Sequence, residues 1–178
     1  RKSAGKIYSS LQGLKIRNSH AVINMTDHEE TKSIAAFIEG LLLKAYHYSD
    51  LKSKKDDSHI VEIDKLTFLL SGDSDHNSVK KAIKKAEILI EGVNFARRLG
   101  DTPGNLLTPS QLARQIQKRF KDDNHITLKV LNESEIKNLK MNAFLSIANG
   151  SKEAPRLVTM QYRSKNKKSG HLLLVGKG

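Results

Sequence analysis

Cysteine and tryptophan are absent from the 178 residues of this chain, and aromatic side chains make up only 5% of it. Without cysteine the chain holds no disulfide, no thiolate zinc site and no cysteine nucleophile. Because nothing in the composition points to an oxidising compartment, we expect a cytoplasmic location. The scarcity of aromatic side chains also leaves few platforms on which nucleic-acid bases could stack.

Long apolar runs are also missing. No stretch approaches the roughly 20 apolar residues that a bilayer-spanning helix needs. The basic start at residues 1–6 is not followed by the apolar stretch of a signal peptide. We therefore expect a soluble chain with no membrane partner. Its 38% hydrophobic and 28% charged residues are typical of a globular protein rather than a disordered one.

Positive charge is what the chain has in excess, with a formal net charge of +12. Residues 1–100 hold 17 Lys and Arg against 13 Asp and Glu, and residues 101–178 hold 14 against 6. This excess allows nucleic-acid binding as an alternative function. However, the basic residues are dispersed, and their one tight cluster follows Tyr162: Arg163, Lys165, Lys167 and Lys168. The competing interpretation is a solvated surface that keeps the protein soluble.

Apolar periodicity predicts alternating helices and strands in the first hundred residues. We expect helices at 1–14, after a capping box at 26–29 as far as Tyr46, and at 77–99, with strands at 20–25 and within 60–70. The first helix should bury Ile7, Leu11 and Leu14. The second should pack its apolar stripe on a sheet. The third should bury Val79, Ile83, Ala86, Ile90 and Val93, with Ala96 or Phe95.

A dense group of Gly and Pro at residues 100–105 predicts a domain boundary. Thr108, Pro109 and Gln111 then have the pattern of a helix start, and this helix should reach Phe120. Beyond it we expect a strand at 126–131, a short helix at 133–140, an ambiguous apolar segment at 141–148 and a strand at 156–163. The fully apolar run 171–175 predicts a final strand at the centre of its sheet. The fold class is α/β.

Familiar catalytic motifs are not found. The sequence has no His-Glu-x-x-His and no Gly-x-Ser-x-Gly, and a phosphate-binding loop ending at Lys177 fails because His171 and Gly178 replace the required Gly and Ser or Thr. The acidic pairs at 56–57 and 122–123 are typical of solvated charge. The seven histidines lack metal-ligand spacing: His20, His28, His47, His59, His76, His125 and His171.

Lys177 is the candidate functional residue that remains. It lies between two glycines directly after the apolar run 171–175, at the end of a predicted strand, where sites in α/β proteins gather. A lysine in such a buried setting favours the neutral amine, which can ligate a metal or transfer a proton. The alternative is a loop lysine that reaches solvent.

Two segments of the chain are similar to signatures of the leucyl aminopeptidase family, the cytosol aminopeptidases of bacteria, plants and animals. One is Gly-Val-Asn-Phe-Ala-Arg-Arg-Leu at 92–99, followed by Thr-Pro-Gly-Asn-Leu-Leu-Thr-Pro at 102–109. The other is Leu-Leu-Val-Gly-Lys-Gly at 173–178. Shorter stretches agree in order, at 39–41, 45–46, 149–151, 155–157 and 161–162. Gly104 departs from the family, whose members more often have proline there.

The resemblance implies a metal-dependent exopeptidase that removes N-terminal residues such as leucine from peptides. Two divalent ions, manganese or zinc, would activate the attacking water. The family's lysine in Val-Gly-Lys-Gly is a metal ligand, so the resemblance assigns that role to Lys177, as the neutral amine. It also implies peptide substrates, a cytoplasmic location and a hexamer.

The resemblance further implies that the chain is an internal piece of a longer protein. Residues 1–76 would be the later part of an N-terminal α/β domain, 77–104 a linking helix and boundary loop, and 105–178 the first portion of a catalytic α/β/α domain. The family's acidic ligands, second lysine and arginine match no residue of this chain, so we assign no catalytic residue and expect the chain alone to be inactive. Because some bacterial members of the family bind DNA as accessory proteins, DNA binding stays the alternative.

Overall fold

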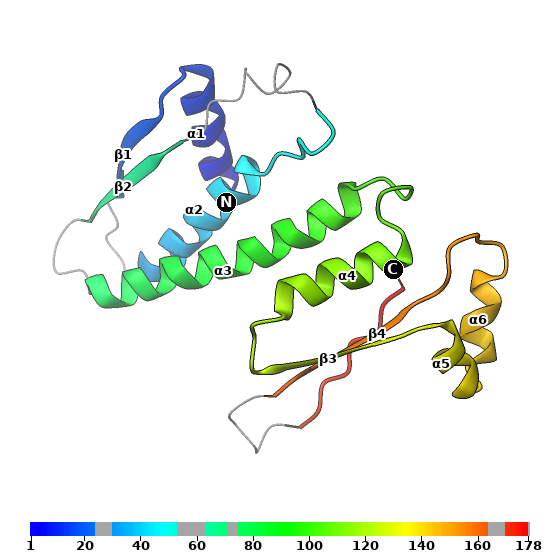
Figure 1. Cartoon of the computed structure of the whole chain (residues 1–178). Coiled ribbons are helices and arrows are strands. Elements are labelled where there is room, and N and C mark those ends of the chain that lie inside the picture. Colours follow the sequence, from blue (N-terminus) through cyan, green and yellow to red (C-terminus); the bar gives the residue numbers. More distant parts are fainter. Residues whose placement is uncertain (24–29, 53–62, 71–74, 164–169, 178) are drawn as a thin grey trace. The chain divides into compact units, whose positions relative to one another are not determined.

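A computed structural model describes residues 1–23, 30–52, 63–70, 75–163 and 170–177. The chain divides into two compact units, which we call unit 1 (Arg1–Asp101) and unit 2 (Thr102–Gly178). Figure 1 shows the helices and strands of each unit, which mix as expected for the α/β class. None of the helices that the structure describes is long and apolar enough to cross a membrane.

Unit 1 is built around two parallel strands and three helices. Its elements are α1 (Lys2–Gly13), β1 (Asn18–Ile23), α2 (Glu30–Ala45), β2 (Lys65–Leu70) and α3 (His76–Asp101). β1 and β2 pair in parallel, from Asn18 opposite Lys65 to Ile23 opposite Leu70, and α2 connects them in sequence. The helices and strands predicted for this half are therefore confirmed within the described residues. The predicted capping box at 26–29 lies outside them.

The helix α2 lies at the centre of the unit 1 core. Its Ile34 and Ile38 pack with Val79 and Ala86 of α3. Its Leu41 packs with Ala4 and Tyr8 of α1, and Leu66 of β2 borders that second cluster. The prediction that α2 packs on a sheet is therefore confirmed only at Leu66 among the described side chains, and α1 and α3 cover much of the apolar stripe as well.

The buried face of α1 also differs from the prediction. Ala4 and Tyr8 are buried, whereas Ile7 is 42% exposed and Leu14 is 71% exposed. At the crossing of α1 and α2, a side chain built at Gly40 would meet the Arg1 backbone, and one at Gly5 would lie 3.7 Å from Lys44 Cβ. Because the two helices approach so closely at Gly5 and Gly40, the face of α1 with Ala4, Gly5 and Tyr8 packs against α2, and Ile7 and Leu14 lie on the exposed side.

The long helix α3 confirms the predicted burial of Val79, Ala86 and Ile90. Farther along, Val93 is 36% exposed, so its predicted burial was wrong. Of the alternatives Ala96 and Phe95, Ala96 is exposed and Phe95 is half-buried. The positions that continue the face of Ile90 at helical spacing are Asn94 and Arg97. This face therefore changes from apolar to polar at about its middle.

Unit 2 contains a pair of antiparallel strands and three helices. Its elements are α4 (Pro109–Phe120), β3 (Ile126–Leu131), α5 (Glu133–Asn138), α6 (Asn142–Ala148) and β4 (Leu157–Tyr162). β3 and β4 pair from Ile126 opposite Tyr162 to Leu131 opposite Leu157. All four elements predicted between 108 and 163 are confirmed, and the ambiguous segment 141–148 is a helix. Their buried apolar residues are Ala113, Leu131 and Ile136.

Local capping explains why two helices of unit 2 begin where they do. The Thr108 hydroxyl accepts a hydrogen bond from the Gln111 amide at 3.4 Å, and Pro109 takes the first helical position of α4, as predicted. At α5, Asn132 and Glu135 form a reciprocal capping box, with 3.0 Å and 2.8 Å between the paired atoms. Both helix starts are therefore set by their own sequences.

The apolar run at 171–175 is not a strand in the structure, which corrects the prediction of a central, buried one. The exposed fractions of Leu172, Leu173, Leu174 and Val175 are 84%, 83%, 85% and 87%. A strand needs neighbouring backbone to satisfy its amides and carbonyls, and neither β3 nor β4 pairs with this segment. Residues 171–175 therefore have the apolar sequence of a strand but lack, among the described residues, the backbone partner that a strand needs.

Candidate functional site

Lys177, the one residue assigned to a metal, follows the exposed segment 172–175 in unit 2. Its side chain is exposed, and Gly176 before it has no other group within 4 Å of where a Cβ would be placed. The expected buried setting is therefore not present in the structure. The role of Lys177 as a metal ligand stays a prediction that rests on the resemblance.

The donor set of the described residues does not fit a two-metal centre. No group of three or more His, Asp or Glu that could hold a metal ion occurs among them. A divalent ion needs several oxygen, nitrogen or sulfur ligands, and a single lysine supplies one. If Lys177 binds a metal, most of the ligands must come from residues other than those described.

A surface hollow of about 320 Å³ brings together several residues of the shorter family-like stretches. Around it lie Glu133, Leu145, Ala148, Asn149, Ser151, Lys152, Glu153, Ala154 and Pro155. The Ser151 amide donates to the Ala148 carbonyl at 2.9 Å, and the Ser151 hydroxyl accepts from the Glu153 amide at 3.0 Å. These bonds form the turn after α6. The lining of the hollow combines three charged side chains, Glu133, Lys152 and Glu153, with four apolar residues, Leu145, Ala148, Ala154 and Pro155.

The family-like segment 102–109 has a structural role in the chain. The carbonyl oxygen of Pro103 accepts hydrogen bonds from the amides of Leu106 and Leu107, both at 2.9 Å. This closes a turn directly before the Thr108 cap of α4. The segment therefore forms a short turn, closed by its own backbone hydrogen bonds, between the end of α3 and the start of α4.

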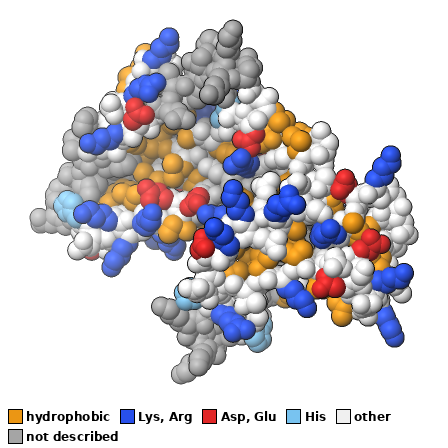
Figure 2. Space-filling model, in the orientation of Figure 1, with side chains coloured by type: hydrophobic (Ala, Val, Ile, Leu, Met, Phe, Trp, Pro, Cys, Tyr) orange, Lys and Arg blue, Asp and Glu red, His pale blue; other side chains and the backbone are white. Residues whose placement is uncertain are grey.

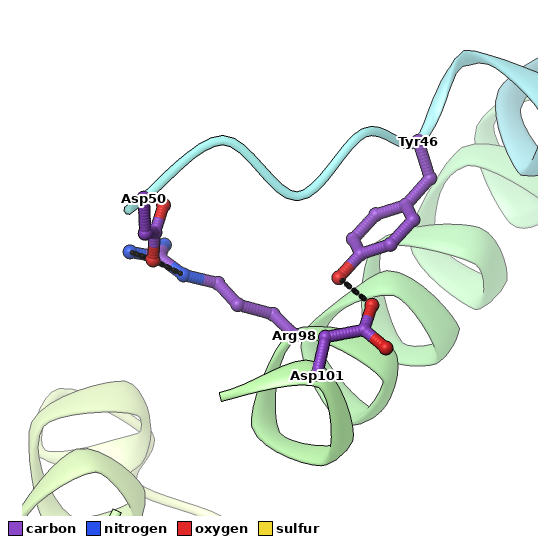
Figure 3. Close-up of polar contacts among 4 residues, drawn as sticks. All are labelled: Tyr46, Asp50, Arg98 and Asp101. Atoms are coloured by element: carbon purple, nitrogen blue, oxygen red, sulfur yellow. Dashed lines mark hydrogen bonds and ion pairs between the residues drawn. The ribbon is translucent and has the colours of Figure 1, made fainter. Parts of the chain in front are cut away.

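A polar network that the sequence did not predict lies at the end of α3 (Figure 3). The Tyr46 hydroxyl donates to Asp101 Oδ2 at 2.7 Å, and Arg98 Nε and Nη2 each lie 2.8 Å from Asp50 Oδ2. The Arg97 guanidinium stacks 4.0 Å from the centre of the Tyr46 ring. The available signal was the spacing of Asn94, Arg97, Arg98 and Asp101, since residues three and four apart share a helix face.

The environment of Tyr46 changes its acidity. Partial burial, the hydrogen bond to Asp101 and the negative charge of that carboxylate raise the pKa of Tyr46 to about 12, and the nearby Arg97 charge opposes the rise. The phenol therefore stays neutral at physiological pH. Tyr46 is therefore a hydrogen-bond donor to Asp101 in this network.

Basic side chains are scattered over the surface drawn in Figure 2, among acidic and apolar ones. Of the basic cluster that follows Tyr162, Arg163 is described and exposed, whereas Lys165, Lys167 and Lys168 lie outside the described residues. Neither observation supports the alternative of DNA binding.

Two models of a single protein family match the chain. The model of the N-terminal domain of the cytosol aminopeptidase family matches residues 1–55, and that of the catalytic domain of the same family matches residues 94–178. Curated relatives of the chain are members of the same family. A probable cytosol aminopeptidase of Geotalea uraniireducens is 31% identical over 181 residues, which are 100% of this chain and 36% of the relative. One of Nitrosococcus oceani is 34% identical over 152 residues, 85% of this chain and 30% of the relative.

Solved structures show the same fold. A mutant of tomato leucine aminopeptidase matches with a TM-score of 0.77 and 22% identity, over 93% of this chain and 33% of that one. The bottromycin maturation enzyme BotP in complex with Mn matches with a TM-score of 0.73 and 18% identity, over 92% and 33%. The chain thus spans about a third of the length of the proteins it matches.

Proposed function

This chain belongs to the cytosol aminopeptidase family, and on that basis we propose that the polypeptide containing it is a metal-dependent aminopeptidase that removes N-terminal residues such as leucine from peptides. The observation that carries the proposal is the order of the two family models, since the N-terminal domain matches 1–55 and the catalytic domain 94–178. The domain division at 1–76, 77–104 and 105–178 is part of the same proposal. The break between the compact units at Asp101 and Thr102 supports a boundary in this region.

The proposed cofactors are two divalent metal ions, manganese or zinc. Manganese is named with BotP, and leucine is named in the tomato enzyme, both of which share the fold of this chain. A cytoplasmic location and a hexameric assembly are proposed with them. The support for the location is the family's description as cytosolic; the hexamer rests on the resemblance alone.

Lys177 is the residue of this chain that we propose as a metal ligand, as its neutral amine. Its support is the match of 173–178 to the family motif. Because the described residues offer no further ligand set, we also propose that the 178-residue chain is inactive on its own.

The role of Lys177 is tested in the longer polypeptide by Lys177→Met, which keeps the length of the side chain but removes the amine. We expect hydrolysis of a leucyl anilide to fall by about 100-fold or more, together with the number of Mn²⁺ or Zn²⁺ ions bound per chain. Lys118→Met, in the last turn of α4, is the matched control and should change neither. Unchanged metal content and activity in Lys177→Met would remove Lys177 from the site.

The proposed inactivity is tested on the 178-residue chain, incubated with Mn²⁺ or Zn²⁺ and leucinamide. We expect no release of leucine above the rate without protein. Release by the purified chain that also follows the added metal would contradict the proposal, and would mean that a complete site lies within these residues.

A further inference from the structure

The face that α3 turns towards α2 changes character along its length. Its first half presents Val79, Ala86 and Ile90, which are buried. At the same helical positions its second half presents Asn94 and Arg97. Asn94 is half-buried, whereas Arg97 is exposed. A half-buried polar side chain such as Asn94 needs a polar partner, because an unpaired donor or acceptor there costs free energy. The groups that Asn94 and Arg97 contact therefore show the structural role of the second half of α3.

Two of these partners are backbone carbonyls at the end of α2. Asn94 Nδ2 donates to the carbonyl oxygen of Leu42 at 3.5 Å, and Arg97 Nη1 donates to that of Leu43 at 2.9 Å. α2 ends at Ala45, so both carbonyls belong to its last four, which have no partner within the helix. The positive charge of Arg97 is also favourable at a helix C-terminus. α3 therefore caps α2 with side chains.

The remaining partners lie in residues 46–50, which we call the strap, directly after α2. Tyr46 stacks under Arg97 and donates to Asp101, and Asp50 pairs with Arg98 through two nitrogens (Figure 3). The strap thus contacts α3 at three residues of its last two turns. Helix ends ordinarily fray, and such contacts oppose fraying.

We propose that the strap and the four α3 residues Asn94, Arg97, Arg98 and Asp101 form a clamp that holds the last two turns of α3, as far as Asp101, on the end of α2 and on the strap. All four residues lie in the part matched by the catalytic-domain model, and their partners Leu42, Leu43, Tyr46 and Asp50 lie in the part matched by the N-terminal model. The clamp therefore attaches the first residues of the catalytic-domain sequence to the N-terminal domain.

Amide hydrogen exchange of the full chain tests the clamp. Arg98→Asp places a carboxylate near Asp50 and Asp101, and we expect the protection of amides 97–101 to fall about fivefold. Tyr46→Leu removes the contact with Arg97 and the hydrogen bond to Asp101 together, and we expect the protection of amides 97–101 to fall about tenfold. In both variants the amides of 79–90 should keep their protection. Lys85→Asp, an exposed charge reversal on the same helix, is the control and should leave 97–101 unchanged.

A charge swap separates the clamp from general stability. Arg98→Asp combined with Asp50→Arg restores the pair with opposite polarity, and we expect it to recover most of the lost protection at 97–101. Protection at 97–101 that is unchanged in Arg98→Asp and Tyr46→Leu would overturn the proposal. An equal loss over 79–90 and 97–101 would overturn it as well, because the residues would then support the whole unit rather than the end of α3.

Discussion

Unit 1 and unit 2 have similar mixtures of helix and strand, yet they bury apolar residues very differently. Among the described residues, unit 1 buries Ala4, Tyr8, Ile34, Ile38, Leu41, Val79, Ala86 and Ile90, whereas unit 2 buries Ala113, Leu131 and Ile136. Unit 2 also has the most exposed apolar segment, 172–175. The comparison shows that an apolar segment is buried only where another helix or strand packs against it.

The arrangement of elements explains this contrast. In unit 1, α2 lies between α1 and α3, so two sides of one helix are covered. The described residues of each unit form a sheet of only two strands, which offers little surface on which to build a core. The two clusters of buried apolar residues found among the described residues both lie in unit 1, where helices pack on one another. Unit 1 should therefore be the more sensitive of the two to changes in apolar side chains.

The largest expected effect is the loss of a buried side chain in unit 1. Ile34 is 0% exposed and lies in the cluster with Ile38, Val79 and Ala86. Ile34→Ala leaves a cavity there, and we expect the free energy of unfolding of unit 1 to fall by about 2–5 kcal/mol. Urea denaturation followed by circular dichroism measures it. Ile88→Ala, at a residue that is 59% exposed, should change stability by less than about 0.5 kcal/mol.

A smaller effect is expected from a glycine at the crossing of α1 and α2. A Cβ at Gly40 would lie 2.7 Å from Arg1 Cα and 2.9 Å from Arg1 C, so Gly40→Ala must push α1 away, at a cost of about 1–3 kcal/mol. Gly92→Ala in α3 is the matched control, since nothing lies within 4 Å, and should stabilise by about 0.5–1 kcal/mol. Equal shifts of the thermal midpoint in both variants would contradict the close helix crossing.

The clamp makes unit 1 sensitive to alkaline pH. Because the pKa of Tyr46 is raised from 10.0 to about 12, the neutral phenol contributes stability that is complete below pH 10 and is lost as the pH rises through about 12. Absorbance at 295 nm, taken as the difference between the chain and its Tyr46→Phe variant, should show this titration. Asp101→Asn should lower the midpoint of the Tyr46 titration, because it removes the negative charge that raises the pKa of Tyr46. A Tyr46 midpoint near 10 in the unmodified chain would rule out the hydrogen bond to Asp101.

The smallest effect is expected at the exposed apolar segment of unit 2. Leu173 is 83% exposed, so Leu173→Gln should change the stability of the 178-residue chain by less than about 0.5 kcal/mol. The same measurement as for Ile34→Ala applies. A loss above about 2 kcal/mol would mean that 172–175 is packed in solution, and would restore the sequence-based prediction of a buried strand.

Much of the secondary structure could be predicted because its signals are local. The cap at Thr108 with Pro109, the periodicity of α3 and the strand at 126–131 all require only neighbouring residues to act. The candidate site could be predicted only in part. Lys177 stays a prediction that rests on its motif. The network of Tyr46, Asp50, Arg98 and Asp101 joins residues about fifty positions apart and has no local signal on the Tyr46 side.

Three predictions failed for a common reason. The faces of α1 and of the second half of α3, and the strand at 171–175, were all inferred from where apolar residues lie. In α1 the small residues Ala4 and Gly5 allow close approach to α2, and in α3 the carbonyls of Leu42 and Leu43 require polar partners. Apolar character alone cannot show which of two faces has a neighbour.

By itself the sequence determined the order and type of most elements before residue 163, a break near residue 101 and the membership of the cytosol aminopeptidase family, since caps, periodicity and motifs are properties of short segments. Only the tertiary structure decided which faces are buried, that the end of α3 is held by the strap, and that 172–175 is left exposed. Burial and hydrogen bonding between distant residues depend on two surfaces meeting, and one strand of sequence describes only one of them at a time.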